Sequence, residues 1–184
     1  MTALASRGQL RASLIRWALF TVPLVMLLGF LSGRIGGDAD SLWFQSLEKP
    51  AIFPPPLWFP IAWSVLYALM GLALAIVCSA WGARGRTAAI VAFAVQLAVN
   101  LAWSPVFFGL HDIRTALIVI GALDILVIVT IVLFWRVRRL AGLLLLPYLA
   151  WIAFATVLNW QFLELNPDGG GQQPGSGAQH RYEF

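Results

Sequence analysis

The sequence predicts an all-α integral membrane protein, a bundle of five transmembrane helices, and three observations carry this prediction. Of the 184 residues, 60% are hydrophobic and only 11% are charged, with a mean hydropathy of +0.83. Soluble domains average about 45–50% apolar and about 25% charged residues, so a soluble fold would lack polar surface. The apolar residues gather into five long runs. The basic residues lie between these runs, without the interleaved aromatic residues of a nucleic-acid surface.

Each apolar run approaches or exceeds the roughly 20 residues that a helical span needs. The predicted spans are residues 17–33, 57–81, 87–108, 114–135 and 143–163. None of them shows the strict alternation of a barrel strand. Short links join the last four, so consecutive helices should be antiparallel neighbours. The remaining segments are a basic N-terminal segment 1–16, a long first loop 34–56 and a glycine-rich tail 164–184, whose composition predicts disorder.

The distribution of basic residues predicts the orientation in the membrane. One side of a five-span topology would carry Arg7, Arg11, Arg16, Arg84, Arg86, Arg136, Arg138 and Arg139, and the other side Arg34, Lys49, Arg114 and Arg181. The positive-inside rule then places the N-terminus inside, and the long first loop and the C-terminus outside. A cleaved signal peptide or a transit peptide is the alternative reading of the first span. No A-x-A-like cleavage site follows it, so the span is taken as retained.

Polar residues inside the spans mark a candidate site, because a lipid-facing residue need only be apolar. Three stripes at helical spacing combine aromatic and polar side chains. They are Trp63, Tyr67 and Gly71; Gln96, Asn100, Trp103 and Phe107; and Tyr148, Trp151, Ala155 and Leu158 with Asn159. Three such stripes facing one cavity would make a small-molecule site. Hydrogen bonding between packed helices explains the same pattern equally well.

Other conspicuous residues have simpler explanations. Trp17, Trp81 and Trp135 lie near span ends, where tryptophan commonly anchors a helix at the membrane interface. Cys78 reads as a small buried hydrophobe. With one cysteine and two distant histidines, His111 and His180, the sequence offers no metal cluster.

Asp124 lies near the middle of the fourth predicted span. An unpaired charge there costs about 2.5–3.5 kcal/mol on the insertion scale. The side chain should therefore face the bundle and be protonated or hydrogen-bonded, either as a structural contact or as a proton relay. Hydrolytic, phosphate-binding and metalloprotease motifs are missing, so nothing in the sequence demands an enzyme, a catalytic residue or an obligatory cofactor.

Three motifs nevertheless form a recognisable signature. The first runs from Trp43-Phe-Gln-Ser-Leu-Glu-Lys-Pro50 through Phe53-Pro-Pro-Pro-Leu-Trp58-Phe-Pro60-Ile-Ala-Trp63 to Tyr67 and Gly71. The second spans Gln96 to Gly109, and the third spans Leu146 to Asn159. In this order and spacing they resemble the TspO/MBR family, the tryptophan-rich sensory proteins, translocator proteins and peripheral-type benzodiazepine receptors. The resemblance covers about residues 17–163 and is strongest from Trp43 onward.

The resemblance implies a five-helix bundle, often dimeric, that binds porphyrins and related tetrapyrroles in one cavity with the first loop as lid. The pocket residues carried over by motif are Trp63, Asn100, Trp103, Phe107, Tyr148, Trp151, Ala155 and Leu158, with Trp43 and Trp58 in the loop. A role in tetrapyrrole transport or in stress- and oxygen-linked regulation follows as an expectation. Basic groups on the predicted outer side, Arg34, Lys49, His111 and Arg114, are candidates to meet the porphyrin propionates.

Two alternative functions stay open. One is light-dependent porphyrin breakdown, although relatives often have Trp-Tyr where this chain has Trp43-Phe44, and the missing phenol counts against it. The other is proton-coupled transport of small apolar substrates through Asp124. The proline-rich stretch 53–63 is interpreted as a rigid hinge between lid and pocket wall, because proline has no N–H to leave unsatisfied.

Overall fold

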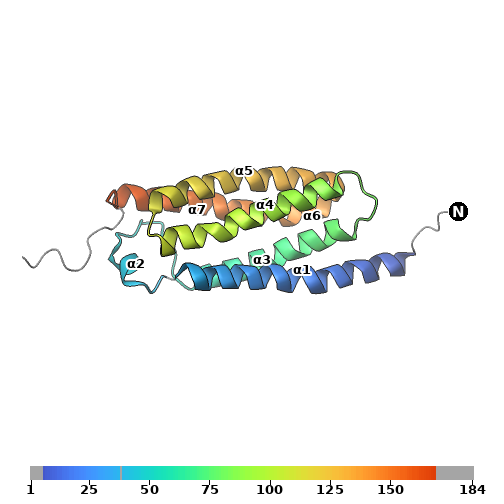
Figure 1. Cartoon of the computed structure of the whole chain (residues 1–184), viewed down its shortest axis with the longest axis horizontal. Coiled ribbons are helices and arrows are strands. Elements are labelled where there is room, and N and C mark those ends of the chain that lie inside the picture. The colour runs from blue at the N-terminus through green and yellow to red at the C-terminus, as the bar shows by residue number, and fades with distance from the viewer. Residues whose placement is uncertain (1–5, 38, 169–184) are drawn as a thin grey trace, which may run out of the picture.

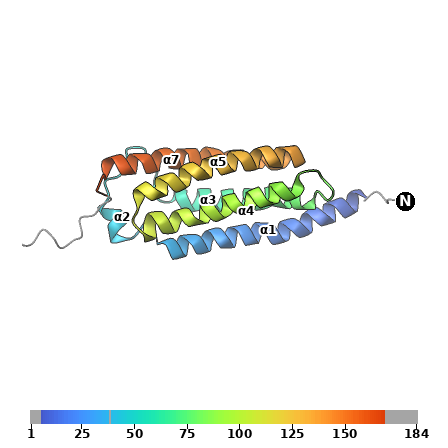
Figure 2. The ribbon, with the colours of Figure 1, turned by 45° about the horizontal axis from the view of Figure 1, so that its top comes forward.

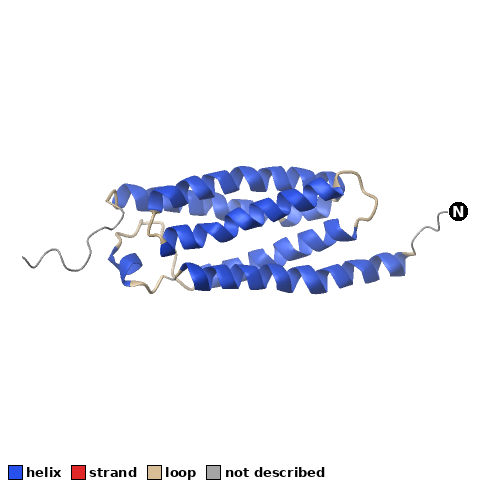
Figure 3. Cartoon of the chain, viewed as in Figure 1, coloured by secondary structure: helices blue, strands red, loops and turns tan. Residues whose placement is uncertain are grey.

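The computed structural model describes residues 6–37 and 39–168, and within them every regular element is a helix (Figure 3). Arg181, His180 and most of the predicted disordered tail lie outside the described residues. Five helical stretches in the described part of the chain are long and apolar enough to cross a membrane. They are Gly8–Gly36, Trp58–Ser79, Arg86–Gly109, Ile113–Val137 and Arg139–Leu165. The predicted all-α, five-span fold is confirmed.

The long helices run antiparallel along one axis of an elongated bundle (Figures 1 and 2). In chain order the elements are α1 (Arg7–Gly36), α2 (Leu42–Ser46), α3 (Trp58–Ser79), α4 (Arg86–Ser104), the π-helix η1 (Pro105–Gly109), α5 (Ile113–Val137), α6 (Arg139–Leu144) and α7 (Leu146–Leu165). The start of α1, the α3–α4 loop and the α5–α6 junction share one end of the bundle, here called the basic end. The α1–α3 connection, the α4–α5 turn and the end of α7 share the other, here called the loop end.

Helix α1 begins at Arg7, inside the stretch 1–16 that the sequence assigned to a separate basic segment. A capping box explains this early start, since Ser6 accepts a hydrogen bond from the Gln9 amide and the Gln9 side chain accepts one from the Ser6 amide. Farther along, α1 packs closely on α3. A Cβ on Gly71 would lie 2.6 Å from the Val22 Cα, and the Thr21 hydroxyl donates to the Gly71 carbonyl at 2.7 Å. Gly71 is therefore a packing residue, as small-residue spacing in membrane helices suggests.

The third span changes from α-helix to π-helix at Pro105, where the sequence places a proline between Trp103 and Phe107. Proline has no N–H to donate to the carbonyl four residues earlier, which belongs to Leu101. The hydroxyl of Ser32 on α1 donates to that carbonyl instead, at 2.6 Å. A wide turn follows, closed by the Leu110 amide donating to the Pro105 carbonyl at 2.9 Å. The proline thus loosens the helix without leaving a buried acceptor unpaired.

The first loop crosses the loop end as a folded strap rather than as a slack connection (Figure 1). Its short helix α2 is capped by Ser41, whose side chain accepts from the Phe44 amide. Asn166, just after α7, holds the strap with two hydrogen bonds, accepting from the Glu48 amide at 2.9 Å and donating to the Glu48 carbonyl at 3.1 Å. The strap ends at α3, which begins at Trp58 with Pro60 in its first turn, where proline is tolerated.

Buried apolar side chains form two clusters. The larger runs along the bundle axis through α1, α3, α4, α5 and α7 and includes Met70, Phe93, Leu123, Phe134 and Tyr148. The smaller lies at the loop end, where Phe44 and Leu47 of the strap pack with Phe107, Ile113, Leu158 and Phe162. Of the candidate site residues, Trp63, Tyr148 and Trp151 belong to the larger cluster, and Trp43, Trp103, Phe107 and Leu158 belong to the smaller one.

Candidate ligand-binding site

A chain of polar side chains crosses the interior between α3, α4 and α7. The Tyr67 hydroxyl donates to Asn100 Oδ1 at 3.0 Å, and Asn100 Nδ2 donates to the Tyr148 hydroxyl at 3.0 Å. Tyr148 in turn donates to Gln96 Oε1 at 3.2 Å. Asn100 is therefore the junction of the predicted second, third and fifth spans. Three of the four side chains are buried, so their hydrogen bonds hold the helices in one register.

Tryptophans lie against this polar chain. Trp63 stacks on Tyr67, with ring centroids 5.1 Å apart, and meets Tyr148 edge-on at 6.4 Å. Trp151, one turn beyond Tyr148 on α7, contacts Phe154 and Phe59. Ala155 follows on the same helix and is half-buried. The predicted stripes of the second and fifth spans thus meet the third around Asn100.

A second polar contact joins α4 to α7 closer to the loop end. The Trp103 indole donates to Asn159 Oδ1 at 3.1 Å, and Asn159 Nδ2 donates to the Ile113 carbonyl at 3.0 Å. Trp103 stacks on Phe107 at 5.0 Å between centroids. Leu158 is buried in the same loop-end cluster. The predicted stripes on α4 and α7 are therefore joined at two places, Asn100 with Tyr148 and Trp103 with Asn159.

The two loop tryptophans occupy different environments. Trp43 is half-buried, meets Phe107 edge-on at 5.6 Å and stacks on His111 at 4.4 Å with an interplanar angle of 17°. Trp58, at the start of α3, is 58% exposed. Trp43 therefore adjoins the other candidate residues, whereas Trp58 lies on the outer surface of the bundle.

Ring contacts connect these residues into one aromatic band. From the middle of the bundle outward the band consists of Trp151, Phe59, Phe53, Phe44, Phe107 and Trp43, with neighbouring centroids 6.0, 5.4, 5.9, 6.2 and 5.6 Å apart. Phe44 and Phe53 of the strap and Phe59 at the start of α3 were not among the predicted site residues. The many aromatic residues beside the prolines were the one sequence signal that could have identified them. Helical spacing does not help here, because it does not predict where the residues of an irregular loop lie.

Asp124 faces the bundle, as its position predicts. Its Oδ2 accepts a hydrogen bond from the Thr156 hydroxyl at 2.7 Å. Two buried polar atoms, Asp124 Oδ1 and Gln96 Nε2, have no hydrogen-bond partner among the described residues. The first sits on α5 and the second at the end of the polar chain on α4. Unpaired buried polar atoms of this kind are costly, so each is a place where a polar group could bind.

The basic side chains at the loop end are arranged unequally. His111 and Arg114 line an open pocket of about 490 Å³ with Leu110, Asp112, Ile113, Leu163 and Pro167. Lys49 points back into the strap, where its ammonium donates to the carbonyls of Phe44 and Leu47 and lies 4.4 Å from the Phe44 ring centroid. Burial lowers the pKa of Lys49 because it disfavours the charged form. Arg34 lies over Phe30 on α1.

Two open pockets in the described part of the chain lie at the two ends of the bundle. Between them the candidate residues are packed against one another. Phe107 is 2% exposed, Asn100 5% and Leu158 6%. A ligand among them would need the strap or the aromatic side chains to move.

Comparison with known proteins identifies the family. Residues 21–165 match the TspO/MBR family. The chain is 37% identical over 147 residues to the tryptophan-rich protein TspO of Chlorobaculum tepidum, covering 79% of this chain and 93% of that protein. It is 43% identical to the protein CrtK of Rhodobacter capsulatus, over 72% of this chain and 81% of that one. It is 36% identical to the human translocator protein, over 71% and 79% of the two chains.

The family match begins within α1 and ends with the last residue of α7, so it spans all five membrane helices and the strap. The matched residues include the polar chain around Asn100, the contact between Trp103 and Asn159, and the aromatic band. The chain is a multi-pass membrane protein, and it belongs to the TspO/MBR family.

Proposed function

We propose that this protein binds porphyrins or related tetrapyrroles between α3, α4 and α7, beneath the strap. The observation that carries the proposal is the continuous aromatic band, which leads from Trp151 in the middle of the bundle to Trp43. There it meets His111 beside the pocket that Arg114 also lines. A porphyrin is a flat aromatic disc with acidic side chains. Indole and phenyl rings suit its faces, and the Arg114 guanidinium at the pocket suits its propionates.

The strap would act as the lid of this site. The band is closed by strap residues, Phe44 among them, and the strap is held to α7 through Asn166. Ligand entry would separate strap rings from Phe107 and Phe162, exposing the polar chain around Asn100. A role in tetrapyrrole transport or in stress- and oxygen-linked regulation rests on this binding step.

Spectroscopic titration with protoporphyrin IX tests the proposal. The Soret band of the porphyrin reports binding directly, without depending on which tryptophan remains. We expect Trp151→Ala and Asn100→Ala each to weaken binding about tenfold, equivalent to ~1.4 kcal/mol. Trp135→Ala, an exposed tryptophan at the basic end, is the matched control and should bind normally. Equal affinity in all four proteins would refute the proposed site.

The same titration separates the alternatives. Illumination of the complex would generate a new absorbing product if the protein degrades porphyrin, and a stable spectrum supports binding alone. Proton-coupled transport has its own support in Asp124, whose Oδ1 is buried without a partner among the described residues. Proteoliposome flux that Asp124→Asn leaves unchanged would eliminate that function.

Orientation and assembly are further parts of the proposal. The described basic side chains at the basic end support an inside N-terminus by the positive-inside rule, and cysteine labelling from either side of sealed vesicles would test it. A homodimer is supported by the outward-facing Ala94, Ala98 and Ala102, which give α4 a smooth face. Cross-linking through Ala98→Cys, with Ile128→Cys on the exposed face of α5 as control, would test that surface.

A further inference from the structure

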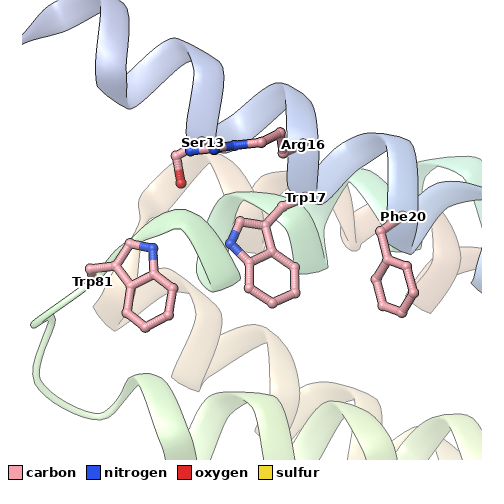
Figure 4. A pocket seen from close by; sticks show the side chains of 5 residues that line it. All are labelled: Ser13, Arg16, Trp17, Phe20 and Trp81. Carbon is pink, nitrogen blue, oxygen red and sulfur yellow. The ribbon is translucent and has the colours of Figure 1, made fainter.

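A second pocket lies at the basic end, far from the candidate tetrapyrrole site. Four residues on one face of α1, namely Ser13, Arg16, Trp17 and Phe20, line it with Trp81 from the α3–α4 loop (Figure 4). Its volume is about 330 Å³. The spacing of the α1 residues places them on consecutive turns of the helix, so the pocket extends along the helix axis.

The pocket combines apolar walls with hydrogen-bond donors. Trp17 and Trp81 lie 6.5 Å apart between centroids, and Figure 4 shows the nitrogen edges of both rings turned toward the gap between them. The Arg16 side chain extends toward Ser13 above this gap. None of these four side chains has a hydrogen-bond partner within the described residues. Two indole N–H groups, a hydroxyl and a guanidinium are thus available to one anion.

Charge around the pocket is of one sign. The described basic end carries Arg11, Arg16, Arg84, Arg86, Arg136, Arg138 and Arg139, while the sequence has no Asp or Glu in 1–37, 80–86 or 135–146. Arg86 lies over the Trp81 ring at 4.3 Å and donates to the Cys78 carbonyl, which fixes Trp81 beside α1. The pocket therefore has no internal anion to neutralise it.

The depth of the pocket matches the lipid headgroups. Gly36 lies nineteen positions after Trp17, which is about 29 Å of helix at 1.5 Å per residue. That distance is close to the roughly 30 Å of a hydrocarbon core. With the end of α1 at one membrane surface, Trp17 and Trp81 lie at the other. Phe20 continues one turn toward the bilayer and is 59% exposed, as an acyl-chain contact would be.

We infer that this pocket binds the phosphate of an anionic phospholipid, with Arg16 and the two indole N–H groups on the phosphate and Phe20 against the acyl chain. Arginine suits phosphate oxygens through its forked donors. An exposed tryptophan at the interface accounts for membrane anchoring alone, but two indole N–H groups converging under an arginine do not follow from anchoring. This inference is independent of tetrapyrrole binding.

Native mass spectrometry of the full chain tests the inference. The protein is released from mixed micelles containing equal amounts of phosphatidylglycerol and phosphatidylcholine with the same acyl chains. We expect one phosphatidylglycerol to be retained in preference to phosphatidylcholine. Arg16→Gln should lower that occupancy about tenfold, as expected for the loss of a charge-assisted hydrogen bond to the phosphate. Arg16→Lys keeps the charge but loses the forked donors of arginine. Its phosphatidylglycerol occupancy should lie between those of the wild type and Arg16→Gln.

Matched controls distinguish a site from a general positive potential. Arg136→Gln removes a charge from the same end without touching the pocket and should retain the lipid, as should Trp135→Leu, whereas Trp81→Leu should lose it. Equal loss in Arg16→Gln and Arg136→Gln would overturn the inference, and so would equal retention of both lipids. Displacement of the lipid by millimolar inorganic phosphate would show an anion site rather than a lipid site and would overturn it too. Helical circular dichroism and the thermal midpoint, unchanged in every variant, confirm that each one is folded.

Discussion

The two ends of the bundle use the same residue types in different ways. At the loop end the aromatic rings pack on one another beneath the strap, and Phe44 is 4% exposed. At the basic end Trp81 is 69% exposed and Phe20 59%, with arginines in place of a covering strap. We infer that an aromatic cluster in a membrane protein forms part of the core where another segment covers it, and contacts lipid where none does. The following predictions test this contrast.

The largest expected difference lies between one buried and one exposed aromatic ring. Phe44→Ala would remove contacts with Phe53, Phe107, Phe108 and Phe162 and should lower the free energy of unfolding by about 3–5 kcal/mol. Trp81→Ala should change it by less than about 1 kcal/mol, because its ring is mostly exposed. Unfolding in mixed dodecyl maltoside and dodecyl sulfate micelles measures both. Similar losses would show that the strap adds no packing beyond that of the open end.

Polar contacts should follow the same contrast on a smaller scale. Asn100→Leu removes the acceptor of Tyr67 and the donor to Tyr148 in the interior, and should cost about 1–2 kcal/mol. Arg86→Leu also removes hydrogen bonds, to the carbonyls of Val77 and Cys78, yet water at the basic end can replace them. The same unfolding assay should give a clearly smaller loss for Arg86→Leu. The reverse order would contradict the view that only the covered region depends on its internal polar contacts.

The sequence predicted the fold from hydropathy and the inward-facing residues from helical spacing. Those signals are local, so Asn100, Trp103 and Asn159 could be placed on facing stripes before any contact was known. The pairing itself, such as Trp103 with Asn159, depends on helix rotation, which spacing does not determine. The early start of α1 could have been found from the capping box at Ser6 and Gln9.

The strap and the basic-end pocket were beyond sequence reasoning for a different reason. An irregular segment has no period, so nothing placed Phe44 and Phe53 between Phe107 and Phe59. Trp17 and Trp81 were assigned individually to the membrane interface, and only the structure brings them together beside Arg16. Of the four basic residues that were candidates to meet the propionates, Lys49 donates to the strap's own carbonyls, whereas His111 and Arg114 line the loop-end pocket.

The strap can be loosened without touching its aromatic rings. Asn166→Ala would delete two hydrogen bonds to the Glu48 backbone, and should cost about 1 kcal/mol because the pair is exposed to water. Hydrogen exchange should then accelerate in peptides covering residues 40–50. Peptides covering the α3–α4 loop at the basic end serve as the internal control and should exchange as before. Acceleration at both ends would mean that the variant loosens the whole bundle rather than its cover.

Acid should weaken the loop end selectively, and this is the smallest effect expected. Asp112 caps α5, accepting from the Thr115 amide at 2.9 Å and from its hydroxyl at 2.6 Å, and these bonds hold the pKa of Asp112 below its ordinary value of 3.8. A carboxyl whose pKa is depressed by folding adds stability above its unfolded pKa, and that stability disappears as pH falls through the folded pKa.

The comparison variant is Asp112→Asn, which keeps a capping oxygen but cannot titrate. Thermal midpoints of both proteins, measured from pH 6 down to pH 2.5, should converge below pH 3.8 as the wild type loses its charged cap. Every other carboxyl is common to the two proteins, so its contribution cancels in the difference. The basic end should add no pH dependence between pH 6 and pH 2.5. The Gly85 cap of α4 has no side chain, and no carboxyl lies near it in sequence. A difference in thermal midpoint that stays constant from pH 6 to pH 2.5 would show that the charge on Asp112 does not stabilise the turn. The two ends would then differ only in how well their aromatic rings are covered and packed.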